Sequence, residues 1–173
     1  MMNKKLLILL PLALLVILVV KIPKKTPEAF VVGNSIPELR FKDVNGNDYF
    51  FNDFRGKVVL INHWATWCQY CLIELPYLEQ FRQKYEREDL EIISLLHDTE
   101  NLDLAKEIIQ DDQLSFPILL ADDNPALSTI ESAGLPYSLL LDRAGSIRFI
   151  HRGFTPGDAK KIQSELNYLL DEQ

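Results

Sequence analysis

The stretch NHWATWCQYC, residues 62–71, contains both cysteines of this 173-residue chain. Cys68 and Cys71 are separated by two residues. The stretch continues a β-rich apolar run, KVVLINHWA (57–65), and leads into ELPYLEQFRQKYERE (74–88), in which apolar residues recur at helical spacing. The cysteine pair is therefore expected where a buried strand passes into a helix, as in an α/β fold.

This spacing suits a redox-active dithiol. If Cys68 begins the helix, Cys71 at i+3 lies on the same face of the first turn, with a Cα separation of roughly 5–6 Å that permits a disulfide. Free backbone N–H groups and the positive end of the helix dipole favour the Cys68 thiolate. Cys68 is then the nucleophile, and Cys71 is placed to attack a mixed disulfide formed at Cys68.

Two other roles for the cysteines carry less weight. A purely structural disulfide across so short a loop removes little freedom from the unfolded chain. A tetrahedral metal site needs four ligands, and beyond the cysteines only His63, His97 and His151 are available, far apart in sequence. A fold can bring distant residues together, but His63 is expected to be a hydrogen-bonded core residue, and no metal or cofactor is expected.

The remaining elements alternate between strands and helices. Asn45-Gly46 within 39–51 predicts an opening hairpin. Further strands are predicted at 90–98 and 116–122, helices at 101–112 and 124–134, a second hairpin from 137–142 and 147–152, and a last helix over Asp158–Leu170. Such an order predicts a sheet that is parallel in the middle and antiparallel at one edge.

Residues 1–25 have the composition of a membrane segment. A short basic start precedes an uncharged run, Leu6–Val20, which spans roughly 22 Å at helical rise and is flanked by lysines that can snorkel. No A-x-A-like site follows the run, so an uncleaved signal anchor is favoured over a cleaved signal peptide. Residues 26–37, rich in proline and small residues, are expected to be a linker, and 38–173 a single domain.

Charge excludes one class of function. Five of the 18 basic residues precede residue 26, which leaves 13 against 25 acidic residues and a formal net charge of about −12 on the rest of the chain. A domain of this charge repels nucleic acid and anionic lipid. No nucleic-acid partner is expected.

The chain also resembles a known family. Residues 58–71 look like a thioredoxin active-site strand, and with the predicted anchor and opening hairpin the chain is similar to the TlpA-like, ResA-like and DsbE-like membrane-anchored thiol-disulfide oxidoreductases of bacteria. The resemblance covers about residues 34–170 and rests on Trp67-Cys68-x-x-Cys71, Pro76, Gly134-Leu135-Pro136 and Gly153. It implies a thioredoxin-like fold, a central mixed β-sheet flanked by helices, with an extra N-terminal β-hairpin.

The resemblance also implies roles for single residues. Pro136 would be the cis-proline that faces the dithiol, and Trp67, Leu135 and Pro136 would contact client polypeptide. Glu74 would be a semi-buried acid/base group that takes the proton of Cys71, because Asn62 replaces the buried carboxylate of thioredoxin. A solvent-exposed helix glutamate is the alternative.

Two departures from the family pattern leave the direction of electron flow open. Tyr70 stands where proline usually precedes the second cysteine, and Tyr137 follows Pro136 where a small hydroxyl residue is commoner. Since about 30 mV of reduction potential corresponds to roughly 1.4 kcal/mol, small changes at these positions can decide between reductase and oxidase.

The expected function is a tethered disulfide reductase. An anchored dithiol belongs on the oxidising side of a membrane, here the inner membrane with the domain facing the periplasm. The expected partners are a membrane electron donor and cysteine-containing clients, with apocytochrome c maturation implied by the resemblance. A thiol oxidase or isomerase is the first alternative, and a copper-binding chaperone module the second. Sco-like copper proteins have one more residue between their cysteines, so the spacing here argues against the second alternative.

Overall fold

The computed structural model describes residues 30–121, 127 and 133–172. The predicted anchor (1–25) and nearly all of the predicted helix at 124–134 therefore lie outside the described residues. Within those residues, no helix combines the length and the apolar character needed to cross a membrane.

A five-stranded mixed sheet forms the centre of the domain, in the order β5-β4-β3-β6-β7. Strands β3, β4 and β5 run parallel, and β6 and β7 are antiparallel at one edge, as predicted. The strands and helices are β1 (Arg40–Lys42), β2 (Asp48–Phe50), η1 (Phe51–Phe54), β3 (Val58–Trp64), α2 (Gln69–Lys84), β4 (Leu90–Leu96), η2 (Thr99–Asn101), α3 (Leu102–Asp111), β5 (Ile118–Leu120), β6 (Tyr137–Leu141), β7 (Ile147–Arg152) and α5 (Asp158–Asp171).

Strand β3 is buried along its whole length because it has a neighbour on each side and chain packed on both faces. Its run of Val, Leu and Ile suits such a position, since β-branched and aliphatic side chains pack well on a pleated surface. The chain leaves β3 at Trp64 and enters α2 at Gln69. The cysteine pair therefore lies beyond the C-terminal end of the central strand, where the strand passes into a helix, as predicted.

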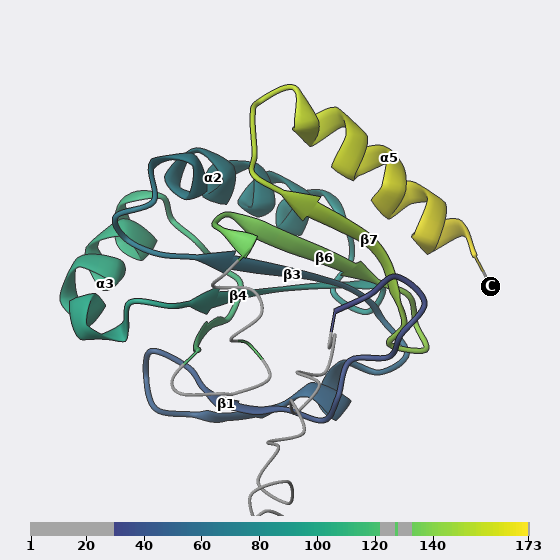
Figure 1. The fold of residues 1–173 in the computed structure, drawn as a ribbon, viewed down its shortest axis with the longest axis horizontal. Helices are drawn as coiled ribbons and strands as arrows, with labels where there is room; N and C mark the ends of the chain where they lie inside the picture. Colours follow the sequence, from purple (N-terminus) through teal and green to yellow (C-terminus); the bar gives the residue numbers. More distant parts are fainter. Residues whose placement is uncertain (1–29, 122–126, 128–132, 173) are drawn as a thin grey trace, which may run out of the picture.

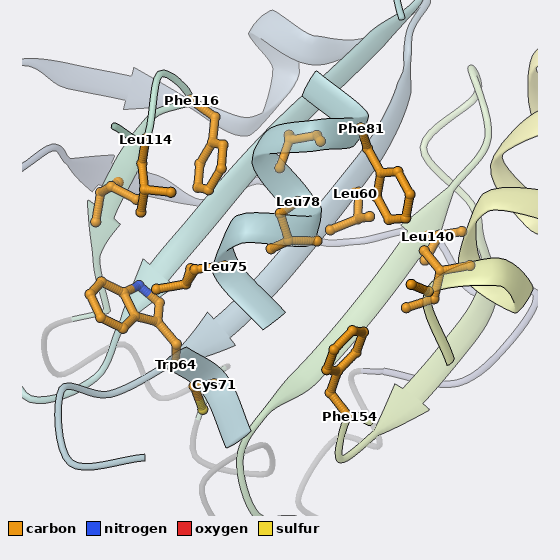
Figure 2. Packing of buried hydrophobic residues seen from close by; sticks show 14 of the residues in the cluster. Leu60, Trp64, Cys71, Leu75, Leu78, Phe81, Leu114, Phe116, Leu140 and Phe154 are labelled. Carbon is orange, nitrogen blue, oxygen red and sulfur yellow. The ribbon is translucent and has the colours of Figure 1, made fainter. Parts of the chain in front are cut away.

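Helix α2 turns one apolar stripe toward the sheet. Leu75, Leu78 and Phe81 are buried and pack with Leu60 of β3, while Cys71 lies at the N-terminal end of the helix (Figure 2). Burying an aliphatic side chain of this size contributes about 2 kcal/mol, so the stripe holds the helix firmly against the sheet. The helix ends at Lys84, one residue before Tyr85, which is the last apolar position of the predicted helical spacing and has an extended backbone (φ −109°, ψ 148°).

One cluster of buried apolar residues packs against each face of the sheet. Helices α2 and α5 cover one face, and the β1–β2 hairpin with η1 lies against the other (Figure 1). The predicted opening hairpin is confirmed, as a separate two-stranded sheet. Its turn is closed by Asp43, whose carboxylate accepts the N–H groups of Asn45 and Asn47, and Gly46 supplies the positive φ (+88°) that the turn requires.

Candidate active site

Cys68 and Cys71 form a disulfide at the start of α2, with a Cα separation of 5.2 Å. Cys68 is the N-cap residue, and its sulfur accepts the backbone N–H of Cys71 at 3.2 Å. Cys71 is completely buried, whereas Cys68 keeps 6% of its surface exposed. The predicted geometry of the pair is confirmed, and the sulfur nearer to solvent is the one at the open end of the helix.

Glu74 lies one turn beyond Cys71 and is buried, with 1% of its surface exposed. Its two carboxylate oxygens accept hydrogen bonds from the side-chain amide of Asn62 (2.9 Å) and from the hydroxyl of Ser138 (3.0 Å). Glu74 therefore points into the sheet, and the alternative of a solvent-exposed glutamate is wrong.

The polar contacts of Glu74 continue across three strands. Ser94 on β4, Asn62 on β3 and Ser138 on β6 are register partners, and the Ser94 hydroxyl donates to the Asn62 carbonyl oxygen at 2.9 Å. All three side chains are buried. Neither serine was predicted as a site residue, although Ser138 is followed by three leucines in β6 and Ser94 interrupts the apolar residues 92–96 of β4, positions that a buried polar network can explain.

Burial raises the pKa of Glu74 to about 7. The hydrogen bonds from Ser138 and Asn62 act in the opposite direction because they stabilise the carboxylate, and the negative charge of Asp158 adds to the increase. A carboxyl group that titrates near neutral pH can both accept and donate a proton under working conditions.

The surface beside the disulfide combines an exposed aromatic side chain with a pocket of mixed polarity. Trp67, just before Cys68, is 70% exposed. The Leu135–Pro136 bond is cis, as predicted, and the Pro136 carbonyl accepts the N–H of Gly153 at 2.8 Å, which ties this loop to the end of β7. A pocket of about 300 Å³ opens here, lined by Trp67, His97, Asp98, Glu100, Gly134 and Leu135.

The three histidines lie in two separate places. Nδ1 of His63 and Nε2 of His97 share a hydrogen bond of 2.9 Å, and His151 pairs with Glu165 at 2.6 Å. Burial and then the charge of His97 lower the pKa of His63 well below its usual value, so this buried ring is neutral. The prediction of a hydrogen-bonded core histidine is confirmed. Among the residues described, no three His, Cys, Asp or Glu side chains are grouped so that they could hold a metal ion.

The two tyrosines that depart from the family pattern have different surroundings. Tyr70 is 59% exposed in the first turn of α2, beside the disulfide. Tyr137 is buried and contacts the ring of His63 edge-on, with ring centroids 6.0 Å apart. Only Tyr70 is therefore free to touch a bound polypeptide.

Comparison with known proteins agrees with this geometry. The Redoxin family model matches residues 31–168. The chain is 32% identical over 121 residues to the thiol-disulfide oxidoreductase ResA of Bacillus thuringiensis subsp. konkukian, covering 69% of each chain, and 30% identical over 134 residues to ResA of Geobacillus thermodenitrificans, covering 77% of this chain and 76% of the relative. Among solved structures, a putative thiol:disulfide interchange protein DsbE from Chlorobium tepidum superposes with a TM-score of 0.74 at 23% identity, over 82% of this chain and 99% of that one.

The fold, the Cys68–Cys71 disulfide and the sequence relatives agree with one another. The chain therefore belongs to the redoxin family, and is a thiol-disulfide oxidoreductase of the ResA type.

Proposed function

We propose that this oxidoreductase is a membrane-tethered, extracytoplasmic disulfide reductase. Electrons enter from a membrane donor, reside on the Cys68/Cys71 dithiol and pass to cysteine-containing client proteins. Apocytochrome c is the foremost client in this proposal, because its haem-attachment cysteines must be reduced in a compartment that otherwise oxidises thiols. The lysine-flanked apolar run at Leu6–Val20 is the proposed anchor.

In the proposed reaction, the Cys68 thiolate attacks one sulfur of the client disulfide. The client S–S bond breaks, a mixed disulfide forms and one client thiolate leaves. Cys71 then loses its proton to Glu74 and attacks the Cys68 sulfur. The Cys68–Cys71 disulfide forms and the second client thiolate leaves, so the client gains two electrons and the reductase loses two.

The single observation that carries this mechanism is the burial of Glu74 one turn beyond a fully buried Cys71. A buried thiol is a poor nucleophile until a base removes its proton, and water has little access to Cys71. A carboxyl group with a pKa of about 7 suits that exchange, since the same group can return the proton when the disulfide is reduced again.

The charges around the dithiol support the reducing direction. A strongly oxidising site stabilises its reduced form, usually by placing cations beside the thiolate. Here neither residue between the cysteines, Gln69 or Tyr70, is basic, and the residues that line the pocket beside Trp67 include no lysine or arginine. Without such a cation the thiolate gains no extra stabilisation, which favours the dithiol as an electron donor.

The test is to trap clients with Cys71→Ser in the full-length protein. The variant retains the nucleophile but cannot resolve the mixed disulfide, so adducts should survive non-reducing electrophoresis and vanish with dithiothreitol. Cys68→Ser is the matched control and should trap nothing. A few extracytoplasmic adducts that include a C-x-x-C-H protein are expected, together with a reduction potential more negative than that of the glutathione couple.

Three results would overturn this proposal. A broad ladder of secreted proteins would indicate a thiol oxidase or isomerase. The absence of adducts, combined with tight copper binding by the wild-type protein, would indicate a copper module. Adducts confined to cytosolic proteins would contradict the extracytoplasmic location.

A further inference from the structure

Asp98 lies just after β4 and has no part in the mechanism proposed above. It is buried, with 4% of its surface exposed. One carboxylate oxygen accepts the backbone N–H of Thr66 at 2.9 Å, and the other accepts the Thr66 hydroxyl. The side-chain amide of Asn101 also donates to Asp98, at 3.3 Å. Both donor groups of Thr66 are thus bound to a single buried carboxylate.

Thr66 belongs to the short segment that joins β3 to α2. Trp67 follows it directly, and the N-cap residue Cys68 follows Trp67. The segment is also held at its start, because the backbone N–H of His97 donates to the Trp64 carbonyl at 3.0 Å. The chain that presents the nucleophile is therefore attached to the end of the neighbouring strand.

We propose that Asp98 is a positioning residue for thiol-disulfide exchange. By holding Thr66 it fixes the direction of Trp67 and Cys68 relative to an incoming client. Exchange requires the attacking, central and leaving sulfur atoms to lie nearly in line, so a small displacement of Cys68 has a large effect on rate. The proposal rests on exchange chemistry at Cys68 and holds for either direction of electron flow.

Variants of both partners test this in the full-length protein, with reduction of a glutathionylated peptide as the assay. Asp98→Ala removes the acceptors and is expected to lower kcat/KM about tenfold to a hundredfold. Asp98→Asn keeps an oxygen for the Thr66 N–H and should retain most of the activity. Thr66→Val removes only the hydroxyl donor, so its kcat/KM should fall less than that of Asp98→Ala. Thr66→Ser restores the hydroxyl and should have a kcat/KM close to that of the parent.

Asp43→Ala is the matched control for a loss of stability. Asp43 is also a buried aspartate, and it also accepts three hydrogen bonds, from Asn45 and Asn47 in the β1–β2 turn. Its removal should lower the thermal midpoint of unfolding without changing kcat/KM of the folded protein. Equal losses of kcat/KM in Asp43→Ala and Asp98→Ala would overturn the positioning role.

The pH dependence of Cys68 alkylation distinguishes an effect of Asp98 on the position of Cys68 from an effect of its charge on the Cys68 thiolate. If Asp98 acts by positioning, the pH midpoint of Cys68 alkylation should be the same in Asp98→Asn as in the parent. If Asp98→Asn instead lost as much activity as Asp98→Ala and moved the alkylation midpoint, Asp98 would act through its charge and the proposal would be wrong. Unchanged kcat/KM in Asp98→Ala would also overturn it.

Discussion

The side-chain amide of Asn62 donates a 2.9 Å hydrogen bond to the carboxylate of Glu74. Asn62 lies on the central strand, at a position where thioredoxin has a buried carboxylate, and Glu74 lies on the helix that carries the cysteines. The proposed acid/base group thus lies on α2 and is hydrogen-bonded to the strand below it. The same helix therefore fixes both Cys71 and the group proposed to exchange its proton.

Glu74→Gln should slow resolution of the mixed disulfide by about a hundredfold near neutral pH, because the amide cannot take the proton of Cys71. The dependence of that rate on pH around 7 should be lost in the variant. Stopped-flow mixing of the reduced protein with a fluorescent client disulfide measures both effects.

Glu79→Gln is the control for Glu74→Gln. Glu79 is a second buried glutamate of α2, and it accepts hydrogen bonds from the backbone and hydroxyl of Ser115, away from the cysteines. Its substitution should affect stability and leave the pH dependence of resolution intact. Identical kinetics in Glu74→Gln and the parent would contradict an acid/base role for Glu74.

Ser138→Ala should raise the pKa of Glu74 further, because it removes a donor that stabilises the carboxylate. The midpoint of the rate–pH profile should move upward by about one unit. Ser94→Ala is the matched control: Ser94 donates to Asn62 and not to Glu74, so the shift should be much smaller. A downward shift in Ser138→Ala would show that the profile reports another group.

Much of the fold could be predicted from local patterns. The apolar run of β3, the helical spacing in α2 and the Asn45-Gly46 turn each predicted the element that forms, because all three are short-range signals. The C-terminal end of α2 was predicted less well. Nothing in the apolar spacing shows where tertiary packing stops, and Tyr85 continues the spacing although it lies beyond the last helical residue.

The site was predictable only where its residues are neighbours in sequence. Cys68, Cys71 and Glu74 share one helix, so their spacing alone placed them on one face. Ser94 and Ser138 join the site through strand register, and Asp98 through the end of β4. These contacts depend on which strands are adjacent, which a single sequence does not specify for isolated polar residues.

The oxidised protein should lose stability as pH rises through the range in which Glu74 ionises. Its pKa is about 7 in the folded protein and 4.5 in the unfolded chain, so between these values the folded state binds more protons. The stability that the raised pKa of Glu74 contributes is fully present below pH 4.5 and is lost as pH rises to about 7. The full effect is about 3 kcal/mol. Urea unfolding at several pH values should show this decrease in the parent and not in Glu74→Gln; equal pH dependence in both would contradict the raised pKa.

Trp67→Ala should weaken client binding while leaving the chemistry of the disulfide unchanged. The indole is 70% exposed beside Cys68, and large exposed aromatic side chains at a binding surface are common hot spots. KM for a client peptide should rise about tenfold with kcat nearly constant, and the free energy of unfolding should change by less than about 0.5 kcal/mol. Leu104→Ala is the control, because Leu104 is a 47% exposed apolar residue on α3, outside the pocket beside the disulfide. A fall in kcat at constant KM in Trp67→Ala would mean that the indole orients Cys68 and does not bind the client.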